Sequence, residues 1–111
     1  MKKISGRVIR GKRKGRELGF PTANLELKEN IASGVYAGKT NVMGKKYEAA
    51  IFAFNNLLEV HILNFDQDIY GKEIEVEFGE KMREAKKFVS DADLKKQIAK
   101  DIEIISNLIS S

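Results

Sequence analysis

The chain of 111 residues contains no cysteine and no tryptophan, and it has one histidine and one proline. Without cysteine there is no disulfide, no thiolate nucleophile and no thiolate-bound zinc or iron–sulfur cluster, and one histidine excludes a multi-histidine metal centre. A metal bound to this protein would therefore have oxygen ligands, a preference typical of Mg²⁺.

The sequence also lacks long apolar runs. Its first residues, MKKISGRVIRGKRKGR, contain too few consecutive apolar side chains for a secretory or membrane-spanning segment, and no later run reaches membrane length. We therefore expect a cytoplasmic protein with no membrane partner. Because 111 residues with 42% hydrophobic content suffice for one core but not for two, residues 1–111 are predicted to form a single domain.

Charge is distributed unevenly along the chain. Residues 1–16 carry eight basic side chains and no acidic one, whereas the rest of the chain has 12 basic and 16 acidic residues. Such a cationic segment suits a nucleic acid backbone, a nucleotide polyphosphate or an anionic membrane surface, and the sign of the charge leaves these alternatives open. Nucleic acid is the least favoured, because residues 1–16 contain none of the aromatic side chains that usually stack on bases.

The first two thirds of the chain are predicted to be short β-strands. Five segments with β-branched or aromatic residues in rough alternation lie between glycines: ISGRVIRG, GVYAGKTNVMG, KKYEAAIFAF, LLEVHILNF and KEIEVEFG. The Gly44–Lys45 pair between the second and the third segment predicts a tight hairpin turn. We expect five or six antiparallel strands in all.

A change of period marks the last twenty residues as a helix. Apolar side chains recur there at spacings of three and four and share one face: Leu94, Ile98, Ile102, Ile105 and Leu108 or Ile109. Ser90 occupies the N-cap position, with Asp91 and Asp93 in the first turn, where the helix dipole favours negative charge. The predicted fold class is mainly β, of α+β type, with the strands closed into a barrel and the helix packed outside.

Glycine and basic residues are concentrated in GKRKGRELG, which places Gly11, Gly15 and Gly19 among four basic side chains. Glycines let a backbone approach phosphates closely and the cations supply charge, so this stretch is a candidate polyphosphate-binding loop. It matches neither the Walker A nor the dinucleotide-binding glycine pattern, and a solvated basic turn has the same composition.

The stretch FPTANLEL contains the only proline of the chain. Pro21 cannot donate to a sheet ladder, so it belongs at the start or the edge of a strand. If the strand continues through TANLEL, Thr22 and Asn24 lie on one face, and the intervening alanine and the leucine that follows lie on the other. A hydroxyl beside an amide can bind a hard cation and phosphate oxygens, although a capped turn uses the same residue types.

The segment LLEVHIL holds a carboxylate between apolar residues. The apolar residues alternate onto one face of the predicted strand, so Glu59 and His61 share the other face. A carboxylate on that face can reach a barrel mouth or a cleft and act there as a general base. An ordinary exposed strand residue gives the same pattern for Glu59, and we interpret His61 as a structural neighbour hydrogen-bonded on the same face.

Four blocks of the sequence occur in the order found in one known family: GRVIRGKRKGRELGFPTANLEL, GVYAG, LEVHILNFDQDIYGKEIEVEF and MREAKKFVSDADLKKQIAKDI. Over nearly its whole length the chain resembles the riboflavin kinase (flavokinase) domain, which stands alone in some proteins and forms the C-terminal half of bifunctional bacterial FAD synthetases. The resemblance implies a six-stranded antiparallel Greek-key barrel with a C-terminal helix. It also implies transfer of the γ-phosphoryl group of ATP to the 5′-hydroxyl of riboflavin, which gives FMN and ADP.

The same resemblance implies roles for individual residues. Thr22 and Asn24 lie at the Mg²⁺ ion and the phosphates, and Glu59 is the general base, with Asn24 as the second catalytic residue. The implied nucleotide-binding residues are Gly11, Lys12, Gly15, Thr22 and Asn24, and the flavin-binding candidates are Asp68, Tyr70, Arg83 and Phe88. Riboflavin and ATP are the implied partners, FMN is the product, and we expect a monomer.

One segment departs from the family pattern. Before the catalytic glutamate, family members carry a glycine and an N-P-T or similar turn with several loop residues, whereas this chain reads AAIFAFNNLLEVHIL, with Phe52 or a neighbour replacing the glycine. Asparagine tolerates the left-handed backbone conformation, so a tight hairpin at Asn55–Asn56 is predicted instead. The shortening favours one alternative, a flavin- or nucleotide-binding module without turnover. No adenylyltransferase half is present in the sequence, so FAD is not an expected product.

Overall fold

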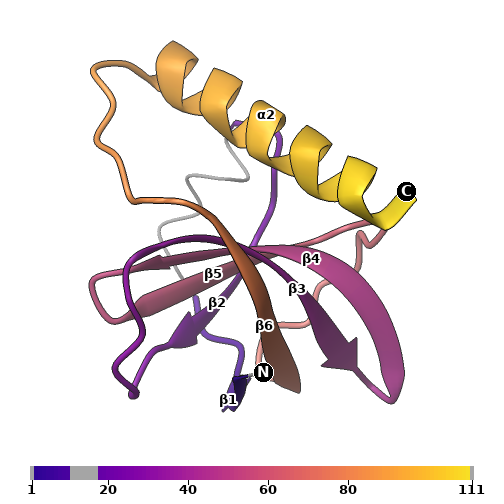
Figure 1. Ribbon diagram of the computed structural model, residues 1–111. Coiled ribbons are helices and arrows are strands. Elements are labelled where there is room, and N and C mark those ends of the chain that lie inside the picture. Colours follow the sequence, from indigo (N-terminus) through magenta and orange to yellow (C-terminus); the bar gives the residue numbers. More distant parts are fainter. Residues whose placement is uncertain (1, 11–17, 111) are drawn as a thin grey trace.

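The computed structural model describes residues 2–10 and 18–110 (Figure 1). Its elements in chain order are β1 (Lys3–Arg7), β2 (Ala23–Glu26), β3 (Gly34–Val42), β4 (Lys45–Phe54), β5 (Leu57–Ile62), β6 (Glu73–Arg83) and α2 (Asp91–Ser110). The glycine-rich basic stretch, and with it the candidate residues Gly11, Lys12 and Gly15, lies outside the described residues.

The strands form one antiparallel sheet of order β1-β6-β3-β4-β5-β2. Hairpins connect β3, β4 and β5, and β6 returns to lie beside β3, which is the Greek-key arrangement. The two edges of the sheet approach each other just after β1, where the Ile9 amide donates to the Asn24 carbonyl of β2 at 2.8 Å. The predicted six-stranded barrel with an outer helix is therefore confirmed, and the barrel is nearly closed.

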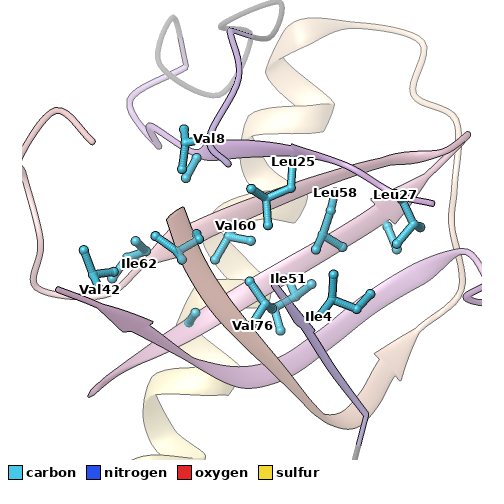
Figure 2. Close-up of a cluster of buried hydrophobic side chains, with 14 of the residues drawn as sticks. Ile4, Val8, Leu25, Leu27, Val42, Ile51, Leu58, Val60, Ile62 and Val76 are labelled. Atoms are coloured by element: carbon cyan, nitrogen blue, oxygen red, sulfur yellow. The ribbon is translucent and has the colours of Figure 1, made fainter. Parts of the chain in front are cut away.

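Aliphatic side chains from all six strands fill the barrel interior (Figure 2). Alternation along β5 is strict, because Leu58, Val60 and Ile62 are buried in this interior while the residues between them are only half-buried. Glu59 and His61 consequently lie on the outer face of β5, as their sequence pattern predicts. Glu59, which belongs to the site described below, therefore projects from the outer face of the barrel wall.

Helix α2 packs against the outer face of β3 and β4 (Figure 1). The outer cluster beneath it consists of Val35, Ala50, Phe52 and Ile105, with Ile98 and Ile102 packed at its edge. Because β4 supplies alternate residues to the barrel interior and to this outer cluster, its AAIFAF run is apolar on both faces. The predicted cap is confirmed, since the Asp93 amide donates to Ser90 Oγ at 3.2 Å. Within the described part of the chain, no helix is both long and apolar enough to qualify as a membrane span.

The turn between β3 and β4 lies one residue earlier than predicted. Val42 pairs directly with Lys45, so the two turn residues are Met43 and Gly44 rather than Gly44 and Lys45. Both turn residues have positive φ, 50° and 83°, which is the geometry that two-residue hairpins require to match the twist of the strands. Gly44 has the larger φ of the two, and its amide donates to Asn41 Oδ1 at 3.1 Å.

The turn between β4 and β5 confirms the predicted Asn55–Asn56 hairpin. Phe54 pairs with Leu57 across it, and the two asparagines adopt φ values of 45° and 64°. A two-residue turn leaves no room for a longer loop at this end of the barrel. The longer loop that the resemblance implies is therefore absent between β4 and β5, and the shortest common hairpin connection takes its place.

We expect the Asn56→Ala variant to be less stable than the wild type by about 1 kcal/mol. Asparagine tolerates the left-handed backbone conformation found at this position, whereas in alanine the same conformation is sterically unfavourable. Thermal unfolding followed by circular dichroism measures the difference. The matched Asn56→Gly variant is expected to retain near wild-type stability, because glycine adopts positive φ without that cost. Equal losses in both variants would mean that the asparagine side chain, and not the backbone conformation, matters at this position.

Candidate active site

Three polar residues, predicted to act at the phosphates or as the general base, lie close together on β5, on β2 and just before β2. Asn24 of β2 stands directly opposite Glu59 of β5 in the sheet register. Thr22, which precedes β2, donates its hydroxyl to Glu59 Oε1 at 3.3 Å across 37 residues of sequence. The fold therefore joins a hydroxyl, an amide and a carboxylate at one edge of the barrel.

The Asn24 side chain is buried, and its oxygen has no hydrogen-bond partner in the part of the chain that the structure describes. Asn24 is 5% exposed, its Nδ2 makes only a long hydrogen bond of 3.5 Å to the Thr22 carbonyl, and its Oδ1 has no hydrogen-bond partner among the described residues. A buried acceptor left unsatisfied costs about 1–3 kcal/mol. Such an atom is suited to receive a cation or a donor that arrives with a ligand.

The start of β2 is held by a side chain as well as by the sheet. The β2–β5 ladder ends at the Ala23–Val60 pair, and Pro21 just before it has no amide hydrogen to donate. His61 Nδ1 lies 2.8 Å from the Pro21 carbonyl oxygen, which can only accept a hydrogen bond. The Phe20 ring packs edge-on against the imidazole, with 6.0 Å between the ring centroids.

A cavity of about 450 Å³ opens beside these residues. Its lining combines the chain after β1, the start of β2, the end of β5 and the segment that follows β5: residues 8–10, 21–24, 60, 62 and 65–70. The Arg10 guanidinium lies over the Tyr70 ring, 4.3 Å from its centroid, and Asp68 Oδ1 accepts a hydrogen bond from the Tyr70 amide at 3.0 Å. Asp68 and Tyr70 thus share one cavity with Thr22 and Asn24.

The other two flavin candidates lie elsewhere. Arg83 at the end of β6 donates from Nε and Nη2 to both carboxylate oxygens of Asp101 in α2, at 2.9 and 2.8 Å, and from Nη1 to the Glu84 carbonyl. Asp101 is 3% exposed and also accepts from Gln97 at 2.9 Å. Phe88 lies in the segment between β6 and α2 and, like Arg83, is not among the residues that line the cavity.

Sequence reasoning missed Asp101, Gln97 and Arg10. The signal for the first two is present in the helix, because Gln97 and Asp101 are four residues apart and flank the apolar stripe at Ile98 and Ile102. A carboxylate at the border of a buried helical stripe needs a cationic partner. Arg10 carries no comparable local signal, since its partner Tyr70 is distant in the sequence.

The side chains that could bind a metal at this site are a hydroxyl, an amide and a single carboxylate, all of which offer oxygen atoms. No group of three His, Cys, Asp or Glu side chains able to hold a metal occurs in residues 2–10 and 18–110. The oxygens that lie on adjacent positions here are Thr22 Oγ1, the Glu59 carboxylate and Asn24 Oδ1, which has no partner among the described residues. This donor set fits a hard cation such as Mg²⁺, which is usually held by one or two protein groups plus substrate phosphates and water.

Comparison with known proteins identifies the family to which this arrangement belongs. The family model for riboflavin kinase, Flavokinase, matches residues 1–109. A bifunctional riboflavin kinase/FMN adenylyltransferase of Haemophilus influenzae is 43% identical over 122 aligned positions, which cover 98% of this chain and 39% of that protein. An RNA-binding riboflavin kinase of Bacillus subtilis is 37% identical, with 93% of this chain and 49% of that protein covered.

The structural comparison agrees in fold. The solved riboflavin kinase of Trypanosoma brucei superposes with a TM-score of 0.70 at 23% sequence identity, over 98% of this chain and 80% of that one. The chain spans less than half the length of the two curated relatives named above. Because the family model covers almost every residue, the chain belongs to the riboflavin kinase (flavokinase) family.

Proposed function

We propose that this protein is a monofunctional riboflavin kinase, which transfers the γ-phosphoryl group of ATP to the 5′-hydroxyl of riboflavin to give FMN and ADP. The observation that carries the proposal is the contact of Thr22 with Glu59 beside the Asn24 oxygen, which has no partner within residues 2–10 and 18–110. A phosphate-binding hydroxyl next to a carboxylate is what phosphoryl transfer to an alcohol requires, because the enzyme must position both substrates and accept one proton.

The cavity is proposed to hold the nucleotide. Thr22 and Asn24 line it together with Arg10 and Tyr70, whose guanidinium and ring are stacked, so phosphate-binding and aromatic groups are present in one space. Aromatic and guanidinium faces are the groups on which nucleobases stack. Asp68 and Tyr70, predicted from the resemblance to contact the flavin, are therefore proposed here as nucleotide contacts.

The acceptor is proposed to approach Glu59 from the outer face of the barrel. Glu59 is flanked there by Asn24 on β2 and by Phe52 on β4, which offer one polar and one apolar neighbour. In this arrangement the riboflavin hydroxyl lies between Glu59 and the phosphoryl group held at Thr22, and the carboxylate accepts the hydroxyl proton. Arg83 and Phe88 stay flavin-side predictions; Arg83 would act there through the Asp101 pair that fastens α2 to β6.

Thr22 Oγ1 and Asn24 Oδ1 are proposed to hold Mg²⁺ together with the nucleotide phosphates. When bound, the ion supplies neutralisation of the phosphate charge that builds up during transfer. The residues themselves do the rest: Thr22 orients the phosphates toward Glu59, and Asn24 presents its side chain from the position opposite Glu59 in the sheet. Cytoplasmic location and the monomeric state stay predictions from the sequence.

The proposed function is tested by incubating the protein with riboflavin, ATP and magnesium and separating riboflavin, FMN and FAD by chromatography. FMN without FAD is the expected product, and a parallel incubation with a chelator in excess over magnesium is expected to yield none. If no FMN forms while riboflavin fluorescence is quenched on binding, the protein is a flavin-binding module without turnover, the alternative that the shortened hairpin suggests. Absence of both turnover and binding would refute the proposal.

We expect the Thr22→Ala variant to bind magnesium–ATP about tenfold or more weakly than the wild type. Removing the hydroxyl deletes a hydrogen-bonding group to a charged ligand, a change that typically costs about 1.5–3 kcal/mol. Isothermal titration calorimetry with a non-hydrolysable ATP analogue and magnesium measures the affinity. Thr22→Ser keeps the hydroxyl and is the matched control, expected to bind nearly as the wild type does; unchanged affinity in the alanine variant would remove Thr22 from the nucleotide site.

A further inference from the structure

We infer that His61 is a positioning residue for the proposed reaction: its hydrogen bond to the Pro21 carbonyl holds Thr22 in contact with Glu59. This inference rests on the proposed function and adds a residue to it. His61 shares the outer face of β5 with Glu59, and Pro21 immediately precedes Thr22 in the chain. The hydrogen bond of 2.8 Å therefore joins the strand that bears the proposed base to the segment that bears the proposed phosphate ligand.

The need for this bond follows from the proline. The main-chain ladder between β2 and β5 begins at the Ala23–Val60 pair, and the chain before it reaches Pro21, which has no amide hydrogen. Without a further fastening, the segment that carries Thr22 would be free to splay from the sheet, as strand ends do. The imidazole of His61 supplies the missing link by donating to the Pro21 carbonyl oxygen.

The bond also determines the protonation of the imidazole. A carbonyl oxygen only accepts hydrogen bonds, so Nδ1 must carry the proton that lies between the two atoms. The ring is held in this orientation by the edge-on packing of Phe20, the residue that precedes Pro21. Phe20, Pro21 and His61 together form a small clasp around the start of the strand.

The contact that depends on the clasp is sensitive to small shifts. Thr22 lies between Pro21, which His61 holds, and Ala23, which the ladder holds, so its backbone is restrained on both sides. Its hydroxyl reaches Glu59 at 3.3 Å, longer than the roughly 2.5–3.0 Å usual for a hydroxyl donor and an oxygen acceptor, so a further displacement would break the contact. A misplacement of about 1 Å in a catalytic arrangement can cost about 100-fold in rate.

Two substitutions separate positioning from simple packing. His61→Asn places an amide donor, Nδ2, at the same number of bonds from the backbone as Nδ1 and can restore the bond to Pro21. His61→Phe keeps an aromatic ring against Phe20 but has no donor. If the hydrogen bond is what matters, the phenylalanine variant is expected to lose at least about tenfold in kcat/KM for ATP, and the asparagine variant should recover most of that loss. Riboflavin affinity is expected to change little in either.

The inference is overturned if His61→Phe turns over like the wild type, or if His61→Asn is impaired as much as His61→Phe while both variants unfold at the wild-type temperature. A second measurement does not depend on activity. His61 is the only histidine of the chain, so in a protein without a histidine tag the ¹⁵N spectrum of the imidazole reports on this ring alone. At a pH where the ring is neutral, the Nδ1–H tautomer is expected, and an Nε2–H tautomer would refute the hydrogen bond.

The same design separates failure of the inference from failure of the proposed function. If the wild type forms no FMN, the proposed kinase function is refuted. The variants are then compared by their affinity for magnesium and a non-hydrolysable ATP analogue. The Nδ1–H tautomer, together with weaker nucleotide binding in His61→Phe and recovery in His61→Asn, would still support positioning of Thr22. Equal nucleotide affinities in the three proteins would refute it.

Discussion

The Glu59→Gln variant is expected to form FMN about 10²- to 10⁴-fold more slowly than the wild type, the range over which a positioned general base usually acts. Glutamine retains an oxygen that can accept the Thr22 hydroxyl contact now made at 3.3 Å, but it cannot take up the proton of the riboflavin hydroxyl. Nucleotide affinity should therefore be nearly unchanged. Single-turnover measurement of FMN formation at saturating ATP and riboflavin isolates this loss from any effect on binding.

The control for Glu59 is Glu26→Gln. Glu26 lies at the exposed end of the neighbouring strand β2, so the two substitutions make the same change of charge on adjacent strands. Turnover of the Glu26 variant is expected to match the wild type. Wild-type turnover in Glu59→Gln would remove the carboxylate from the mechanism, and equal losses in both variants would point to a general effect of charge.

The Arg83→Met variant is expected to be less stable to unfolding by about 3–5 kcal/mol, the range typical when one member of a buried ion pair is removed. Asp101 is 3% exposed, and without the guanidinium its carboxylate would keep, among the described residues, only the hydrogen bond from Gln97. The loss follows from leaving a charge buried without a counter-ion, not from the strength of the pair itself. Urea unfolding monitored by tyrosine fluorescence and circular dichroism measures the difference.

Two further variants test this reason. Arg83→Met combined with Asp101→Leu removes the stranded charge and is expected to recover most of the lost stability, because apolar replacements of buried ion pairs are often neutral or stabilising. Lys3→Met disrupts the Lys3–Glu77 pair, 3.7 Å long and more exposed to solvent, and should leave the unfolding midpoint nearly unchanged. A double variant as unstable as Arg83→Met alone would contradict the stranded-charge explanation.

The double variant also bears on flavin binding. If it folds and binds riboflavin like the wild type, Arg83 serves the site by joining β6 to α2 and does not touch the flavin. If it folds but loses riboflavin affinity selectively, the direct flavin contact predicted from the resemblance is supported instead. The comparison is informative because the Nε and both Nη nitrogens of Arg83 already donate hydrogen bonds to Asp101 and to the Glu84 carbonyl.

Predictions from local pattern agreed with the structure where neighbouring residues decide the outcome. The inward and outward faces of β5, the apolar stripe of α2 with its Ser90 cap and the Asn55–Asn56 hairpin follow from periods of two and 3.6 and from the backbone preferences of single residue types. The Gly44–Lys45 turn was wrong by one residue, because the pairing of Val42 with Lys45 sets the turn and no local signal specifies that register.

In the candidate site, too, some features follow from the local sequence and others from the tertiary structure. The sequence by itself determined which residue types the chemistry has available: no thiolate, one imidazole, and a hydroxyl, an amide and a carboxylate in two short motifs. Only the tertiary structure decided that Asn24 and Glu59 face each other, that Asp68 and Tyr70 share a cavity with Thr22, and that Arg83 pairs with Asp101. The reason is physical: side-chain identity and local periodicity act over a few residues, whereas these contacts depend on how distant strands align and how the helix packs across them.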